Sequence, residues 1–537
     1  MLTLKDWQNH LPELKAKKVD FPHFDVQAVK QAGKEQPIWI HFGGGNLYRA
    51  FHSQIAQTLA NLGKLSCGPV VVETFSHYTI DNVYKPYNND FLQVVMAADG
   101  SLHECVCAVT ADALFANLKR PKDFECVQQM FESPKLQLAT FTITEKGYSL
   151  TDGEGKLLPF VQREIAAGPQ KPASTMGTVA SLLYARFRAG AYPIALASTD
   201  NFSRNGERFR TEVLRIITGW HKNKLVDQDF VDYVSDESQV SFPWSMIDRI
   251  TPNPSEDILE KLKAQGWSDL SLKSSPSGTH FAGFSNTEQA HYLVMEDNFP
   301  NGRPKFEDAG VIMCDRETAE KADTMKVTAC LNPLHTCLAI YGCLLGYKRI
   351  WQEMEDPDLV SLIHHLGYNE DLPVVTDPKV INPREFIDEL LTQRLPNKAL
   401  PDAPQRIATD TSQKIPIRYG HTLNAYLKAG KDVTQLTYIP LVIAGWLRYL
   451  IAKDDKGSDF TPSPDPLLPM LQDQMHTVTL GCQGSTTIHA AVEPICSNKT
   501  IFSCDLYEIG LGPKIERMLK EELVGPGAVR KTIEHYI

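Results

Sequence analysis

The amino-terminal part of the chain alternates short apolar runs with glycine-rich turns and an amphipathic segment. Residues 37–42 form an apolar run that leads directly into Gly43-Gly44-Gly45. Residues 47–59 then carry an apolar side chain at every fourth position, which predicts a helix. Residues 70–72 predict a second strand, which ends at Glu73. A strand, a glycine loop, a helix and a second strand in this order are typical of the start of a dinucleotide-binding fold.

The hydrophobic pattern differs between the two halves of the chain. In the first half, further apolar runs predict strands at residues 92–97, 105–110, 136–144 and 192–199. After about residue 304 helical periodicity dominates, at residues 319–351, 386–394, 440–450 and 512–523. We therefore predict an α/β, Rossmann-type domain over residues 1–295 and a mostly α-helical domain over residues 296–537.

Composition and net charge exclude several classes of protein. Hydrophobic residues make up 42% of the 537 residues and charged residues 22%, which is ordinary for a globular protein. With 54 basic and 65 acidic residues the net charge is −11, so we expect no broad surface for nucleic acid or anionic membranes. The longest apolar stretch, residues 438–452, is shorter than the roughly 18 residues that cross a bilayer. It also contains Arg448, and the pattern predicts a buried helix.

The cysteines and the first residues predict a reduced, cytoplasmic protein. The 11 cysteines include no CxxC pair, and the first residues lack the apolar core of a signal peptide. We expect a monomer or weak homo-oligomer that binds a small molecule.

The glycine loop is a candidate phosphate-binding site. Gly43 and Gly45 match the first two positions of GxGxxG, whereas Tyr48 occupies the third. Pyrophosphate needs backbone N–H groups at a helix amino terminus with no Cβ in the way, although many such turns are glycine-rich for packing alone. Glu73 is placed to accept both ribose hydroxyls and to repel a 2′-phosphate, which would favour NAD over NADP. The alternative for Glu73 is a solvated strand end.

Two later strands also end in polar clusters. Residues 144–148 (Thr-Glu-Lys-Gly-Tyr) and residues 198–201 (Ser-Thr-Asp-Asn) each follow an apolar run. Ligands of open α/β sheets bind at the carboxyl ends of strands, so these tips are candidate contacts. Asp, Asn and Gly are also ordinary turn residues, which leaves turn chemistry as the alternative.

The densest group of chemically useful side chains lies near the middle of the chain. Lys326, Asn332 and His335 occur where a helix is expected to begin. A lysine can take a hydroxyl proton as hydride leaves if its surroundings depress its usual pKa of about 10.4. An Asn amide and a His can then hydrogen-bond the oxygen as charge develops. The alternative is a surface lysine, with Asn and His capping a helix.

A cationic segment follows a proline-rich loop at residues 401–404. Arg406, Lys414 and Arg418 could bind a hydroxyl-rich or carboxylated substrate, since arginine suits a bidentate carboxylate. A charged, solvated turn is the alternative. The sequence contains no HExxH, P-loop or GxSxG motif, so metalloprotease, P-loop and hydrolase chemistry are not favoured.

In this order the segments resemble the polyol-specific long-chain dehydrogenase/reductase family, also known as the mannitol dehydrogenase family. The resemblance covers roughly residues 35–520. The matching blocks are His41-Phe42-Gly43-Gly44-Gly45 with Arg49-Ala50, Thr144-Glu145-Lys146-Gly147-Tyr148, Ser198-Thr199-Asp200-Asn201 with Asn205-Gly206, residues 245–252, Glu296-Asp297 with Gly302-Arg303-Pro304, Leu331-Asn332 with His335, and Asp410 with Lys414. Each block is weak alone, but the ordered set is specific.

The resemblance implies an NAD-dependent, metal-independent oxidoreductase of CH–OH groups, with an active site in the cleft between the two domains. It implies that Lys326 is the catalytic lysine and that Asn332 and His335 stabilise the oxyanion. The implied cofactor contacts are Phe42, Gly43, Gly45, Glu73, Thr144, Glu145 and Lys146. The implied substrate contacts are Asn201, Asp248, Arg406, Lys414 and Arg418.

The sequence departs from the family pattern beside the lysine. The interval from Lys326 to Asn332 is one residue longer than usual, Pro333 replaces a glycine, and Asp323 replaces a glutamate. A bulge in the helix would absorb the additional residue.

The segment around Lys414 is closest to the branch that acts on D-mannonate and D-fructuronate, because Gln413 and Arg418 flank that lysine. A carboxylated substrate would explain the additional cation. Mannitol 2-dehydrogenase activity is the alternative, and a catalytically inactive NAD-binding protein is a further one.

Overall fold

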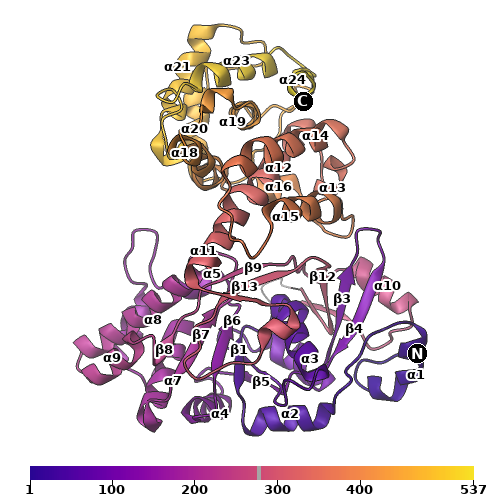
Figure 1. The fold of residues 1–537 in the computed structure, drawn as a ribbon, viewed down its shortest axis with the longest axis vertical. Coiled ribbons are helices and arrows are strands. Elements are labelled where there is room, and N and C mark those ends of the chain that lie inside the picture. The colour runs from indigo at the N-terminus through magenta and orange to yellow at the C-terminus, as the bar shows by residue number, and fades with distance from the viewer. Residues whose placement is uncertain (275–279) are drawn as a thin grey trace. The chain divides into compact units, whose positions relative to one another are not determined.

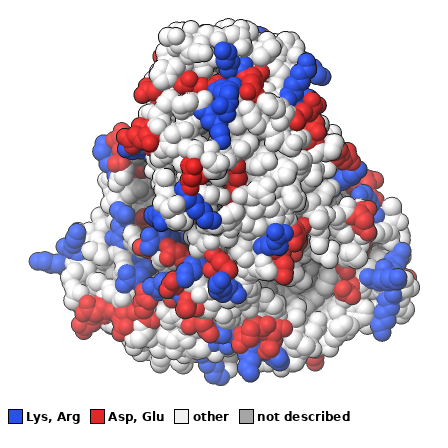
Figure 2. Space-filling view, turned by 45° about the horizontal axis from the view of Figure 1, so that its top comes forward, with Lys and Arg blue, Asp and Glu red and all other residues white. Residues whose placement is uncertain are grey.

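The computed structural model describes residues 1–274 and 280–537, and the chain divides into two compact units. Unit 1 comprises Met1–Ala97 and Ser101–Glu320, and unit 2 comprises Ala98–Gly100 and Lys321–Ile537. Unit 1 contains the sheets, whereas unit 2 is built from helices (Figure 1). On the face shown in Figure 2, acidic and basic side chains are interspersed, in keeping with a modest net charge for a chain of this length.

A six-stranded parallel sheet forms the centre of unit 1. Its order is β5-β2-β1-β6-β7-β8, which is the 3-2-1-4-5-6 order of the Rossmann fold. The strands are β1 (Trp39–Phe42), β2 (Val70–Glu73), β5 (Asp112–Phe115), β6 (Leu138–Phe141), β7 (Ile194–Ser198) and β8 (Val240–Ser241). The predicted α/β class and the strands expected around β1, β2, β6 and β7 are confirmed.

Helices cover both faces of this sheet (Figure 1). Ile40 and Phe42 pack into one apolar core, and Trp39, which points the opposite way, packs into another. Burial on both faces explains why these strands are continuous apolar runs. The helices of unit 1 are α1 (Leu11–Ala16), α2 (Val26–Glu35), α3 (Ser53–Asn61), α4 (Pro121–Glu132), α5 (Thr144–Tyr148), α6 (Pro159–Ala167), α7 (Thr175–Gly190), α8 (Asn205–Lys222), α9 (Gln228–Ser235) and α10 (Glu256–Ala264).

Three smaller sheets complete unit 1. The expected hairpin is present as β3 (Phe91–Met96) and β4 (Leu102–Cys107), with β12 (Phe284–Glu288) on the other side of β3. β10 (Leu272–Ser274) pairs with β11 (His280–Ala282). β9 (Ser245–Asp248) pairs with β13 (Tyr292–Glu296), which also pairs with β14 (Ile312–Cys314). These pairings extend unit 1 to Glu320, whereas the sequence pattern places the division at residue 295.

Unit 2 is helical, as predicted. Its helices are α11 (Arg316–Met325), which crosses the unit boundary, α12 (Asn332–Leu345), α13 (Ile350–Glu353), α14 (Pro357–His365), α15 (Pro383–Glu389), α16 (Pro404–Ile407), α17 (Thr411–Ile415), α18 (His421–Lys428), α19 (Tyr438–Leu450), α20 (Leu468–Met475), α21 (Ser485–Cys496), α22 (Lys499–Phe502), α23 (Gly512–Glu522) and α24 (Ala528–Tyr536).

Two apolar helices form the core of unit 2. Every residue of α19 from Ile439 to Leu450 is buried, which confirms the expected buried helix. Arg448 lies within it and donates to the carbonyl oxygens of Lys453 and Asp454 at 2.7 and 3.1 Å. The continuous helix from Arg316 to Leu345 is long and apolar enough to cross a membrane, but 78% of its apolar window is buried inside the protein.

A buried arginine fixes the amino ends of β6 and β7. Arg186 on α7 is fully buried and donates to five carbonyl oxygens at 2.7–2.9 Å, those of Phe131, Ser133, Leu136, Tyr192 and Pro193. Leu136 precedes β6, and Tyr192 and Pro193 precede β7. One side chain therefore satisfies the backbone at the starts of two neighbouring strands and at the end of α4.

We expect Arg186→Met to lower the free energy of unfolding by about 3–5 kcal/mol, because it leaves several buried carbonyl groups without donors. The measurement is urea-induced unfolding followed by tryptophan fluorescence. Arg188→Met, at an exposed position of the same helix, is the matched control and should change stability by less than about 0.5 kcal/mol. Equal effects of the two substitutions would contradict this role.

Candidate functional site

The glycine loop leaves the carboxyl end of β1 in a conformation that only glycine adopts easily. Gly43 has φ +98°, and a Cβ there would lie 2.1 Å from the carbonyl oxygen of Thr142. A Cβ on Gly45 would meet no atom within 4 Å, so the backbone there faces open space. The helical turns start at residue 46, directly after the loop. This open backbone at a helix amino terminus fits a pyrophosphate group.

Glu73 lies against the same loop. Its Oε1 accepts a hydrogen bond of 2.8 Å from the Gly44 N–H, and the side chain is half-buried. Burial raises the pKa of Glu73 to about 7, and the Gly44 hydrogen bond opposes that rise. Glu73 is therefore not a freely solvated strand end. Phe42 is different, because its ring is buried and stacks on Phe141 at 4.6 Å, which leaves only its backbone for a cofactor.

Asp200 holds the polar tips of β6 and β7 together. Its carboxylate accepts the N–H groups of Ile143 and Thr144, each at 2.9 Å, and the hydroxyl of Tyr148 at 2.8 Å. Thr144 has φ 64°, an uncommon left-handed conformation that these bonds stabilise. Thr144, Glu145 and Lys146 are exposed at the sheet edge beside the glycine loop. The predicted cofactor contacts of unit 1 therefore gather at one edge of the sheet.

The two predicted substrate contacts of unit 1 have different surroundings. Asn201 directly follows Asp200 and is exposed. Asp248 ends β9 and is buried. Asn205 connects these segments, because its Nδ2 donates to the carbonyl oxygens of Asp200 and Ser245 at 3.0 Å each.

Lys326 begins a wide helical turn. The turn Lys326–Cys330 (η6) is a π-helix between α11 and α12, closed by the Leu331 N–H on the Lys326 carbonyl at 3.1 Å. A π turn holds one more residue than an α turn, which absorbs the additional residue between Lys326 and Asn332. Lys326 is 2% exposed, and its Nζ lies 3.6 Å from Asp323. It is therefore not a surface lysine.

His335 lies one helical turn beyond Asn332, among charged side chains. Within the described residues its Nε2 is buried without a hydrogen-bond partner, and it lies 3.9 Å from Asp402 Oδ2. Burial lowers the pKa of His335 to about 4; Asp402 opposes this, while Arg418, Arg406 and Arg394 favour it. The ring is neutral at physiological pH. Asp402 and Arg394 were not predicted, because the sequence gives no sign that their distant segments meet His335.

The predicted cations of unit 2 surround the same helix end. Arg406 is exposed and pairs with Asp402, and Arg418 donates to Thr336 Oγ1, next to His335. Lys414 donates to the Ile407 carbonyl at 3.0 Å, and burial, followed by Arg418, lowers its pKa to about 8. Both arginines contribute to lowering the pKa of Lys414, so the three cations lie near one another. Arg406 is exposed, whereas Lys414 and Arg418 are half-buried and therefore do not belong to a fully solvated turn.

No group of three or more His, Cys, Asp or Glu side chains suited to a metal occurs within residues 1–274 and 280–537. Metal independence stays a prediction.

Comparison with known proteins agrees with both units. Residues 37–308 match the Mannitol dehydrogenase Rossmann domain and residues 320–509 the Mannitol dehydrogenase C-terminal domain. The chain is 50% identical to a D-mannonate oxidoreductase of Thermotoga maritima over 519 residues, covering 96% of this chain and 95% of that protein. It is 27% identical to a polyol:NADP oxidoreductase of Gluconobacter oxydans, covering 83% and 85%.

Two solved structures have the same fold. A substrate-free D-sorbitol dehydrogenase has a TM-score of 0.81 at 24% identity, covering 99% of this chain and 100% of that one. The mannitol 2-dehydrogenase of Pseudomonas fluorescens has a TM-score of 0.69 at 23% identity, covering 99% of each chain.

The charges around His335 make its titration testable. We expect its ring to stay neutral between pH 6 and 8, whereas His489, whose pKa Glu516 raises, should titrate in the usual range or above. Arg418→Ala should raise the pKa of His335 by removing a cation, and Asp402→Asn should lower it by removing an anion. Histidine-selective NMR measures these values. A wild-type His335 that titrates near 6.5 would contradict the expected burial.

Proposed function

Because the chain belongs to the mannitol dehydrogenase family, we propose that it interconverts D-mannonate and D-fructuronate with NAD as cofactor. The 50% identity to a D-mannonate oxidoreductase, over nearly the full length of both chains, carries this proposal. The protein is an oxidoreductase of CH–OH groups. The substrate is a small sugar acid or polyol, and we propose that it is the sugar acid and that the protein acts in the cytoplasm as a monomer or weak homo-oligomer.

The residues of unit 1 suit NAD. The backbone at Gly43 and Gly45 can approach a pyrophosphate, and Glu73 at the end of β2 can accept ribose hydroxyls. Exposed Thr144, Glu145 and Lys146 border the same edge. NAD supplies the hydride acceptor for alcohol oxidation, and its reduced form supplies the hydride for ketone reduction.

The residues of unit 2 suit proton transfer at the reacting carbon. Lys326 takes the hydroxyl proton during oxidation and returns it during reduction. The lysine is buried, and its Nζ lies 3.6 Å from the carboxylate of Asp323. Asn332 and neutral His335 hydrogen-bond the oxygen as negative charge develops there. The buried Nε2 of His335 has no partner within the described residues, so it can bond a substrate oxygen. This arrangement has no purpose in a catalytically inactive NAD-binding protein.

The cations near His335 support a carboxylated substrate. Arg406, Lys414 and Arg418 would bind the hydroxyls and the far carboxylate of the acid. For Asn201 and Asp248 of unit 1, substrate binding stays a prediction from the family resemblance. Since Arg418 already donates to Thr336, its guanidinium is held in place before substrate arrives. A neutral polyol such as mannitol would bring no carboxylate to Arg418 and Lys414, whereas Arg406 already pairs with Asp402.

Two substitutions separate proton transfer from carboxylate binding. Arg418→Ala should weaken kcat/KM for mannonate by roughly ten- to a hundredfold, the value of a charge-assisted hydrogen bond, and change mannitol oxidation little. Lys326→Ala should depress kcat on both substrates, because the base is needed for either. Steady-state kinetics with mannonate and mannitol measure both effects. If Arg418→Ala lowers kcat/KM equally for mannonate and mannitol, or if the wild-type protein prefers mannitol, mannitol 2-dehydrogenase activity would be favoured instead.

Glu73 should make the choice of cofactor depend on pH. With a pKa of about 7, its carboxyl is charged above neutrality and repels a 2′-phosphate, whereas below neutrality it is increasingly protonated and repels it less. The preference for NAD+ over NADP+, measured as a ratio of dissociation constants, should therefore shrink from pH 8 to pH 6. Glu73→Gln controls for titration of the phosphate itself. An equal pH dependence in both proteins would show that Glu73 is not responsible.

A further inference from the structure

A charged cluster lies next to Glu73, where the loops that follow β2 and β5 leave the sheet. Glu73 and Phe115 are paired in register at the ends of these two strands. The Asn117 side chain joins the loops by donating to the Thr74 carbonyl at 3.0 Å. In a Rossmann sheet this edge meets the adenosine ribose.

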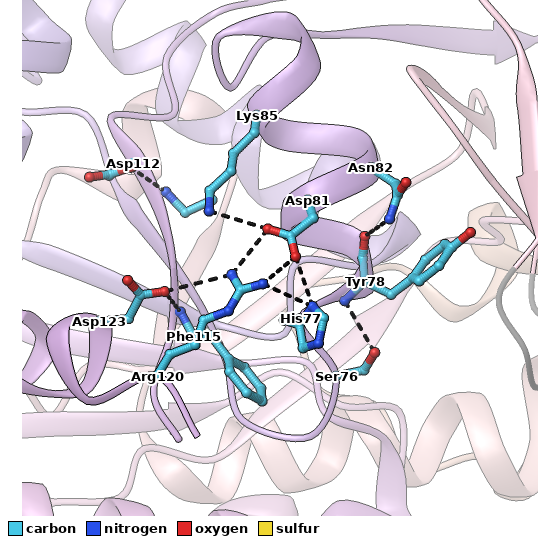
Figure 3. Close-up of polar contacts among 11 residues, drawn as sticks. Ser76, His77, Tyr78, Asp81, Asn82, Lys85, Asp112, Phe115, Arg120 and Asp123 are labelled. Carbon is cyan, nitrogen blue, oxygen red and sulfur yellow. Dashed lines mark hydrogen bonds and ion pairs between the residues drawn. The ribbon is translucent and has the colours of Figure 1, made fainter. Parts of the chain in front are cut away.

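Asp81 is the centre of the cluster (Figure 3). Arg120 donates to both of its carboxylate oxygens, one of them at 3.0 Å, and Lys85 Nζ donates at 3.2 Å. His77 Nδ1 lies 2.8 Å from the same carboxylate. These contacts, with Arg120 first, hold the pKa of Asp81 well below its usual range, so Asp81 is charged.

The cluster contributes little to stability, because its members are partly exposed and water screens such pairs. Its clearest effect is on the orientation of the cationic side chains. The Arg120 guanidinium lies over the Phe115 ring, 5.9 Å from the ring centre, with its nitrogen donors turned to Asp81. Arginine and lysine next to an adenosine ribose are the groups that would bind a 2′-phosphate.

We propose that Asp81 is a second determinant of cofactor choice, because it occupies the cations that would otherwise bind the 2′-phosphate of NADP. The proposal rests on the proposed use of NAD. Glu73 acts by repulsion at the ribose, whereas Asp81 acts by keeping Arg120 and Lys85 engaged. The chain would thus contain a potential phosphate-binding site whose cations are already bonded to Asp81.

The test is calorimetric binding of NAD+ and NADP+ to the Asp81→Asn protein. We expect the ratio of the NADP+ to the NAD+ dissociation constant to fall about tenfold, because at least one charge-assisted hydrogen bond to phosphate becomes available. The matched control is Asp123→Asn, which removes a charge 3.9 Å from Arg120 but leaves the contacts with Asp81. It should not change the ratio. Adding Arg120→Gln to Asp81→Asn should abolish the gain.

Small ligands identify the subsite. In Asp81→Asn, 2′,5′-ADP should bind more tightly than in wild type, whereas 5′-AMP should bind equally. If Asp81→Asn gained affinity for inorganic phosphate alone, the proposal would be overturned, because this would show a general effect on anion binding. Melting temperatures confirm folding, and Asp81→Ser is the second variant if Asp81→Asn does not fold.

The two proposals fail differently. If wild type binds no NAD+, the proposed cofactor is wrong. If wild type binds NAD+ but neither Asp81 variant gains affinity for NADP+, only the role of Asp81 is wrong.

Discussion

The carboxyl edge of the central sheet depends on the buried carboxylate of Asp200. A carboxylate can be buried only if hydrogen bonds replace its water, and Asp200 obtains them from Ile143, Thr144 and Tyr148. Burial raises its pKa, and these donors oppose the rise. The same bonds hold Thr144 in its left-handed conformation and place the tip of β6 beside that of β7. Asp200 thus helps to fix the exposed Thr144–Lys146 segment, and the ion pair between Arg208 and Glu145 holds it as well.

Unit 2 obtains its site from wide π turns in three separate helical segments. Lys326 begins one π turn, Arg394 ends another in Leu390–Arg394, and Arg418 lies in a third in Pro416–Gly420. Such turns replace regular i→i+4 bonds and persist only where packing supports them. Here Thr422 donates to the Thr328 carbonyl at 3.1 Å and Tyr419 to the Pro333 carbonyl at 2.8 Å. The wide turns bring side chains to one region that a regular helix would direct elsewhere.

Local pattern predicted the elements that have long or strongly apolar sequences. The strands around β1, β2, β6 and β7 and the buried helix α19 were expected, because their periodicity requires no knowledge of distant residues. β8 has two residues, too few for a period, and β12 joins the hairpin from far along the chain. The burial of Lys326 was not predictable either, since lysine is usually exposed and the packing around it is tertiary. For the same reason Asp402 and Arg394 were missed, whereas Arg406, Lys414 and Arg418 share one segment.

Arg186 and Asp200 act at opposite ends of the same two strands, and the contrast bears on how this fold diversifies. At the amino ends, a guanidinium is bonded to five carbonyl groups of the backbone, so any change of path there breaks several bonds together. At the carboxyl ends, the anchor is the buried carboxylate of Asp200, and the loop residues around it are solvated. Evolution can therefore alter the recognition surface by exchanging loop residues, while the opposite end preserves the scaffold.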